Sequence, residues 1–191
     1  MAAFDQKDAD ISRGCRQNRP EAWRQLVGKY TPLVYRVAYR MLREKPAAED
    51  AAQEVFMAVH RSITQHDPTR PLGPWLARIT YNECLKRLAK SKRIAEREVP
   101  QDAASSHHRE MGVSPEEMVG QRQVSETVEA ALDRLSAQDR GMIVMRYREG
   151  FTDTEIAQAV SMPVGTVKTR LYRARARLKR YLAPLFREVV S

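Results

Sequence analysis

Carboxylates clustered at the start of one predicted helix are the first candidates for chemistry. Glu49, Asp50 and Glu54 lie with Gln53 on the outer face of the stretch AAEDAAQEVFMAVHRSI. Their oxygens could bind Mg²⁺, as in a nuclease, but such a site needs oxygen ligands that converge from a second segment. This half of the sequence supplies no obvious second segment. We therefore interpret the cluster as a solvated acidic face, favoured by the dipole at the helix start.

Histidine and cysteine are placed less favourably for a metal. His107 and His108 are adjacent, in a polar stretch where solvated side chains are expected. Cys15 and Cys84 lie far apart without metal-ligand spacing and are predicted to be buried, reduced thiols. Because no nucleophile and base are paired convincingly either, we predict a protein without metal, cofactor or enzymatic activity.

Basic residues give the strongest chemical signal. The chain has 191 residues, a formal net charge of +9 and a pI near 9.8, which favours a polyanionic partner over a small neutral substrate. Positive charge is densest near the end of the chain, where no acidic residue occurs between Val164 and Arg187. Nucleic acid is the favoured polyanion, and an acidic membrane surface is the alternative.

The element that positions these charges is residues 151–181, FTDTEIAQAVSMPVGTVKTRLYRARARLKRY. Thr152 and Glu155 form a capping-box signature that starts a short helix, and Pro163 suits the first turn of a second helix. Apolar residues recur in this second helix at helical spacing, at Val167, Leu171, Ala174 and Leu178. Its other faces are cationic, which is typical of a helix-turn-helix that reads the major groove of DNA. A solvated basic helix, or one that binds RNA or an acidic protein, is the alternative.

A second basic segment, PWLARITYNECLKRLAKSKR, follows a polar, proline-rich loop at residues 65–74. Trp75 and Tyr81 lie among its arginines and lysines, and aromatic rings interleaved with cations suit the unstacked bases of a single strand. Packing in the core is an equally good interpretation of Trp75.

Apolar periodicity over the rest of the chain predicts an all-α protein. We expect two small helical domains, residues 1–94 and 114–191, joined by a flexible linker at residues 95–113, with the helix-turn-helix ending the second domain. Pro32 should kink or restart one helix, and Gly150 should end another. No apolar window is long enough for a membrane span and the N-terminus is unlike a signal peptide, so a cytoplasmic location is expected.

With both halves in view, the chain resembles bacterial RNA polymerase sigma factors of the sigma-70 family, extracytoplasmic-function group. The segment EDAAQEVFMAVHRSI resembles the core-binding helix of sigma domain two. PWLARITYNECLKRL resembles the segment of that domain that melts the promoter and reads its minus-ten element. Residues 131–178 resemble domain four, and VGTVKTRLYRAR is a highly specific stretch within them. The likeness covers nearly the whole chain apart from the N-terminal residues and the linker.

The resemblance implies roles for particular residues. Those expected to dock on the clamp helices of the largest polymerase subunit are Asp50, Gln53, Glu54 and Phe56. Residues 66–73 would hold a flipped base of the minus-ten non-template strand, although this loop has more proline and less aromatic character than the family pattern. Those expected along that strand are Trp75, Arg78, Tyr81, Asn82 and Lys86. Those matching the minus-thirty-five recognition helix are Thr166, Lys168, Thr169, Arg170, Tyr172 and Arg173, with Thr166 and Arg170 holding phosphates or the helix start.

The resemblance also implies partners: core RNA polymerase, promoter DNA as duplex and as melted non-template strand, and an anti-sigma factor, often membrane-anchored. The residues alone, without the resemblance, leave two alternative functions open. One is a two-domain regulator whose N-terminal half dimerises or senses a ligand, and which binds DNA tightly without polymerase. The other is a DNA-processing enzyme with a helical catalytic half, such as a nuclease or recombinase.

Overall fold

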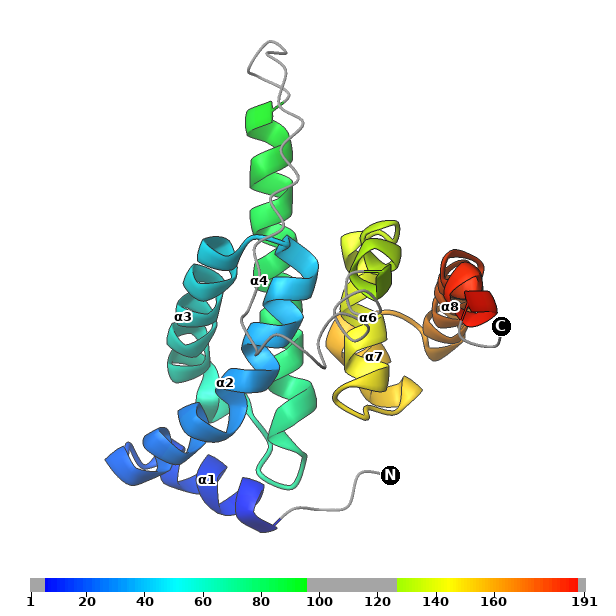
Figure 1. Ribbon diagram of the computed structural model, residues 1–191. Helices are drawn as coiled ribbons and strands as arrows, with labels where there is room; N and C mark the ends of the chain where they lie inside the picture. The colour runs from blue at the N-terminus through cyan, green and yellow to red at the C-terminus, as the bar shows by residue number, and fades with distance from the viewer. Residues whose placement is uncertain (1–5, 96–126, 189–191) are drawn as a thin grey trace, which may run out of the picture.

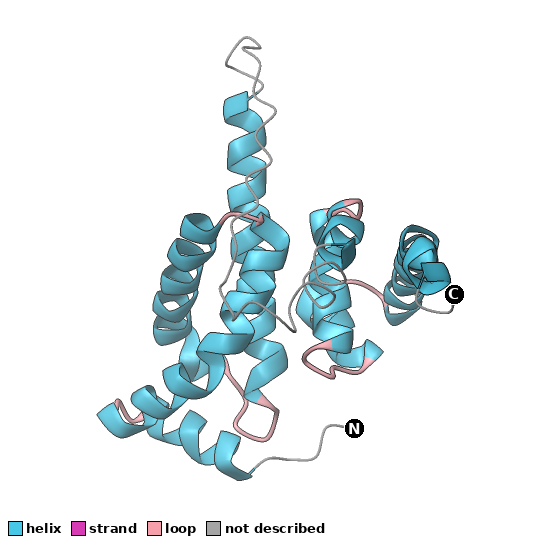
Figure 2. Cartoon of the chain, viewed as in Figure 1, coloured by secondary structure: helices cyan, strands magenta, loops and turns pink. Residues whose placement is uncertain are grey.

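The computed structural model describes residues 6–95 and 127–188, and within these ranges the chain forms helices and turns without any strand (Figures 1 and 2). The predicted all-α fold is confirmed. The N-terminal half contains α1 (Gln6–Arg16), α2 (Pro20–Leu42), α3 (Lys45–Ser62), the 3-10 turn η1 (Ile63–Gln65) and α4 (Leu72–Ala95). The C-terminal half contains helical residues 127–133, α6 (Ala137–Tyr147), α7 (Asp153–Val160) and α8 (Val164–Glu188). Residues 96–113 of the expected linker, and the beginning of the second expected domain at residue 114, lie outside the described residues.

Proline shapes two helices differently from expectation. Pro32 neither breaks nor restarts α2, which runs unbroken past it because Tyr30, Leu33 and Val34 all lie in the core. That burial outweighs the backbone hydrogen bond that proline cannot make. The fourth helix begins at Leu72, two residues before Pro74, because proline in a first helical turn gives up an N–H that would lack a helical partner anyway.

Alanine lets α3 approach the neighbouring helices closely. Its inner face is fully or almost fully buried at Ala48, Ala51, Ala52, Val55 and Val59. Before it, Arg43 takes a left-handed conformation (φ 63°) that ends α2 and turns the chain within two residues. The helices α2, α3 and α4 pack against one another on these apolar faces.

The C-terminal half begins and ends its helices at the predicted signals. Ser136 accepts the backbone N–H of Asp139 at the start of α6, and Gly150 has the expected positive φ of 70°, in the turn after that helix. Thr152 and Glu155 form the full capping box of α7. Ser161, at φ 54°, then reverses the chain into α8.

The two halves share one apolar core. Helix α6 packs against α2, and α7 packs against α4 (Figure 1). Gly141 of α6 lies so close to α2 that an added Cβ would come within 3.0 Å of Met41 Sδ and 3.4 Å of the Tyr81 ring. The two expected helical domains therefore also pack against each other, a contact about which local sequence patterns carry no information.

Polar contacts surround this apolar interface. Arg36 donates two hydrogen bonds to the Glu149 carboxylate, at 2.7 and 3.0 Å. Arg40 and Arg43 both pair with Glu129, and although burial opposes it, they lower the pKa of that carboxyl. Two further contacts reach the last turn of α2, where Arg140 donates to the carbonyl oxygens of Arg40 at 2.7 Å and Met41 at 3.3 Å.

Candidate nucleic-acid interface

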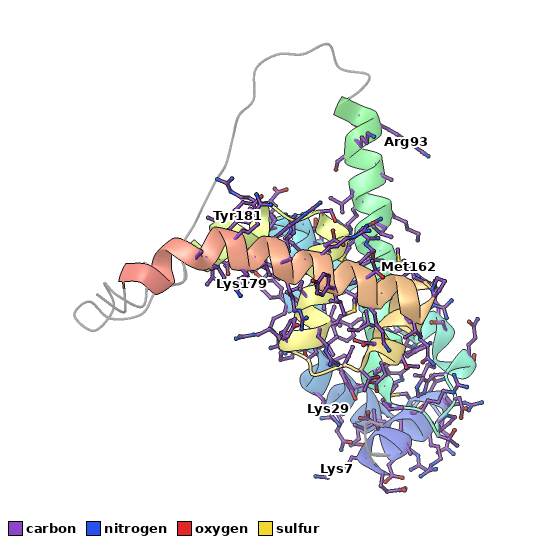
Figure 3. All side chains as sticks on the ribbon, turned by 90° about the vertical axis from the view of Figure 1, so that its right-hand side faces the viewer. Lys7, Lys29, Arg93, Met162, Lys179 and Tyr181 are labelled. Atoms are coloured by element: carbon purple, nitrogen blue, oxygen red, sulfur yellow. The ribbon has the colours of Figure 1, made fainter. Side chains whose placement is uncertain are left out.

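Helix α8 exposes the cationic face that the sequence predicts. Val167, Leu171 and Ala174 are buried against the rest of the C-terminal half, which fixes the rotation of the helix about its axis. Figure 3 looks onto this helix, which runs across the molecule from beside Met162 to Lys179 and Tyr181. The predicted minus-thirty-five residues that the structure leaves exposed are Thr166, Lys168, Thr169, Tyr172 and Arg173. Tyr172 is 66% exposed, so its ring is accessible to a partner.

Arg170 lies on a different side of α8 and is already paired. Its Nε donates to Asp139 Oδ1 at 2.8 Å, and its Nη2 donates to Gln138 Oε1 at 3.0 Å. These two hydrogen bonds join α8 to the first turn of α6. Of the two roles expected for Arg170, the structure therefore favours holding a helix start over holding a phosphate.

Exposed polar residues also line one side of α4, at Arg78, Asn82 and Lys86. Their four-residue spacing places them on a single stripe of the helix. Trp75 is half-buried, with its ring centroid 5.0 Å from that of His66. Both a packing role and a partly accessible ring thus fit Trp75.

Tyr81 does not belong to this stripe. It is 1% exposed and shares the inner face of α4 with Ala77 and Cys84, where its ring meets Gly141 of the other half. Burial raises its pKa to about 12. In this packed arrangement Tyr81 is therefore covered and cannot meet a strand that runs along α4, because helical periodicity turns position 81 toward α6.

The loop between η1 and α4 presents a short polar tip. The Asp67 carboxylate accepts the backbone N–H of Thr69 at 2.9 Å and its hydroxyl at 2.7 Å, and these hydrogen bonds lower the Asp67 pKa. The backbone N–H of Arg70 donates to the backbone carbonyl oxygen of Asp67 at 2.9 Å. Sequence reasoning treated this loop as a whole and missed these individual residues, although Asp-Pro-Thr is a recognisable side-chain-to-backbone turn signal.

The acidic face of α3 lies away from the core. Asp50 and Gln53 are exposed, whereas Glu54 and Phe56 are half-buried. Glu54 also lines an open cleft of about 540 Å³ between α3 and α4, whose opposite side includes Glu83 and Lys86. The predicted polymerase-binding set thus adjoins the predicted strand-binding stripe at Lys86.

Other candidate chemistry finds little support among residues 6–95 and 127–188. Within them no three His, Cys, Asp or Glu side chains gather as metal ligands. Cys15 and Cys84 are buried free thiols, as predicted, and burial raises their pKa values to about 11 and about 12. The described helices include none long and apolar enough to cross a bilayer. His107 and His108 lie outside the described residues.

Comparison with known proteins identifies both halves. Residues 26–94 match the family model for sigma-70 region 2, and residues 125–178 match that for sigma-70 region 4. The chain is 32% identical to the ECF RNA polymerase sigma factor SigW of Bacillus subtilis, over 86% of this chain and 91% of that protein. It is 33% identical to the ECF RNA polymerase sigma factor SigE of Mycolicibacterium smegmatis, over 85% of this chain and 62% of that protein.

A solved structure shares the fold. The sigma factor RpoE of Bartonella quintana, crystallised in complex with the anti-sigma factor NepR, superposes with a TM-score of 0.67 at 24% identity, covering 84% of this chain and 96% of that one. The family models occur in the expected order, and the similarity to SigW, over 86% of this chain, accounts for both halves together. The chain therefore belongs to the sigma-70 family of RNA polymerase sigma factors, in its extracytoplasmic-function group.

Proposed function

We propose that this chain is an alternative sigma factor, a dissociable subunit that binds core RNA polymerase and directs it to a particular class of promoter. The observation that carries the proposal is the pairing of region 2 and region 4 in one chain, each with an exposed cationic helix. In this role the protein acts in the cytoplasm and performs no covalent chemistry, since polymerase supplies the active site.

Helix α8 would read the minus-thirty-five element in the major groove. Lys168, Thr169, Tyr172 and Arg173 are exposed on it and are our candidates for base and backbone contacts, with Thr166 near the helix start. An arginine that makes a bidentate contact to guanine discriminates against other bases by ~1–3 kcal/mol. Arg173 is the residue we assign to such a contact.

The N-terminal half would bind the melted minus-ten element. The stripe formed by Arg78, Asn82 and Lys86 suits a single strand that runs along α4, with the half-buried Trp75 near the start of that helix. The loop at residues 66–73 would take up an extruded base, and that contact offsets part of the few kcal/mol that unstacking costs.

Simultaneous contact with both elements requires the halves to separate. The two promoter elements lie about two helical turns apart, or roughly 70 Å of duplex at ~34–36 Å per turn. The packed arrangement also covers Tyr81, which can meet a base only when α6 moves away. We propose that core polymerase binds the separated halves, with Asp50, Gln53, Glu54 and Phe56 docking α3 on its largest subunit.

An anti-sigma factor is the partner we propose for the inactive state. The related RpoE was crystallised with such a protein. The family resemblance implies an inhibitor that is often anchored in the membrane. An inhibitor that binds the packed arrangement would keep both α4 and α8 from promoter DNA.

Transcription from purified components tests the proposal. Core polymerase alone, and core polymerase with this chain, are compared on a library of genomic fragments, and initiation sites are mapped from the transcripts. We expect new, clustered start sites only when the chain is present. Tight, palindrome-specific DNA binding without polymerase, and no effect on initiation, would identify an ordinary repressor or activator instead.

A further inference from the structure

Helix α1 lies outside the region 2 match, which begins at residue 26, yet it contacts the loop proposed to bind a flipped base. Its Asp8 is 5% exposed. The carboxylate accepts the Tyr30 hydroxyl at 2.6 Å, the Lys29 ammonium at 2.7 Å and the backbone N–H of Leu72 at 3.1 Å. Asp8 therefore links α1 and α2 to the residue at which the loop enters α4.

One turn further along α1, Ser12 holds the other end of the same loop. Ser12 Oγ and His66 Nδ1 lie 2.8 Å apart, and both residues are almost fully buried. The His66 ring packs against Trp75, the first aromatic residue of α4. Burial lowers the His66 pKa, so the ring is neutral at physiological pH. A neutral imidazole nitrogen and the Ser12 hydroxyl can form a hydrogen bond in which either one is the donor.

Between these two attachments the loop has a defined shape. Its tip, with Asp67, Thr69 and Arg70, is exposed and closed on itself by the hydrogen bonds to the Asp67 carboxylate. Both ends are thus fixed by α1, and only the tip is free to meet a ligand. A loop held in its binding conformation loses less conformational entropy when it binds than a free loop does.

We propose that Asp8 and Ser12 are positioning residues that set the geometry of the base-binding loop, and so control selectivity at the minus-ten element. The inference rests on the proposed function. Neither side chain needs to touch DNA: Asp8 acts through the Leu72 amide, and Ser12 acts through His66.

The test uses Asp8→Asn and Ser12→Ala in the full chain, each assembled with core polymerase. Asp10→Asn is the matched control, because Asp10 lies on the same helix, is exposed, and accepts hydrogen bonds from its helix neighbours Gln6 and Arg13. The probe is a pool of single-stranded DNA randomised over the minus-ten element, and bound sequences are counted. A second pool of duplexes, randomised over the minus-thirty-five element, reports on α8.

We expect Asp8→Asn to reduce the preference for the best base over the worst by about tenfold, equivalent to ~1.4 kcal/mol. Ser12→Ala should reduce it less, and Asp10→Asn should leave it unchanged. Core affinity and minus-thirty-five preference should be the same in all variants. This pattern separates a positioning role from a general loss of folding. A loss of folding would lower minus-ten preference, core affinity and minus-thirty-five preference together.

Two outcomes overturn different claims. Should the wild-type holoenzyme show no base preference in the single-strand pool, the proposed minus-ten function itself fails. Full selectivity in folded Asp8→Asn and Ser12→Ala holoenzymes, with a selective wild type, refutes only the role of α1. A parallel fall in core affinity would also refute it, because Asp8 and Ser12 would then merely stabilise the N-terminal half.

Discussion

Replacing Glu149 with glutamine should make this protein bind core polymerase more tightly. Glu149 lies in the C-terminal half and holds Arg36 of α2 through two hydrogen bonds across the interface between the halves. Glutamine keeps one acceptor oxygen but removes the charge. If the halves must separate before polymerase binds, any loss of contact between them lowers the free energy of that separation and raises the apparent affinity.

The magnitude follows from the burial of the pair. A hydrogen bond to a charged group contributes ~1.5–3 kcal/mol, whereas an exposed ion pair contributes ~0.2–1 kcal/mol. The Glu149 side chain is 7% exposed but that of Arg36 is 39% exposed, so solvent screens the pair in part. We estimate a loss of about 1–2 kcal/mol, which corresponds to an increase in apparent affinity of roughly 5- to 30-fold.

Equilibrium binding to core polymerase measures this change in apparent affinity. DNA is left out, because removing a carboxylate could otherwise strengthen binding by reducing repulsion of the nucleic acid. Glu21→Gln is the control, since Glu21 is exposed on α2 and pairs with Arg24 without touching the other half. Thermal unfolding verifies that both variants fold. Unchanged or weaker binding of a folded Glu149→Gln variant would refute the reasoning that separation precedes docking.

Four further predictions follow from the site and the buried groups. Arg173→Ala should lower discrimination at one minus-thirty-five base by ~1–3 kcal/mol without changing core affinity, as measured by competition between promoter duplexes. Asp50→Lys should weaken co-purification with core polymerase while circular dichroism and minus-thirty-five duplex binding stay unchanged. Cys84, whose pKa burial raises to about 12, should resist a thiol reagent at pH 8 in the folded protein and react promptly in urea. Burial lowers the pKa of His66 in the folded protein, so the unfolded chain binds a proton there more readily. The free energy of unfolding should therefore fall as the pH drops below about 6.5. In His66→Gln the urea midpoint should fall less steeply over the same pH range.

Local signals in the sequence were sufficient for the helix-turn-helix. A side-chain oxygen at Thr152 and a carboxylate at Glu155 satisfy each other's backbone donors, and that arrangement depends on residues three positions apart. The rotation of α8 followed from its apolar spacing, which places Val167, Leu171 and Ala174 inside. Such features are predictable because every partner lies within about two helical turns.

Contacts between distant segments were not predictable in this way. Tyr81 was grouped with the neighbouring cations, because the sequence did not reveal that α6 would cover the inner face of α4 at this position. The hydrogen bond from the Leu72 N–H to Asp8 and the one between Ser12 and His66 join positions 64 and 54 residues apart. No periodicity within α1 distinguishes Asp8 from the exposed Asp10, since what separates them is the partner that each one meets.

The hydrogen bonds of Arg140 indicate what a protein that takes the place of α6 must supply. The last carbonyl groups of a helix have no donor within it, and at the end of α2 two of them accept hydrogen bonds from this one guanidinium. When α6 leaves, those oxygens must find water or new donors. A polymerase surface that covers the vacated end of α2 would therefore bind best with an arginine, a lysine or free amide groups of its own at that place.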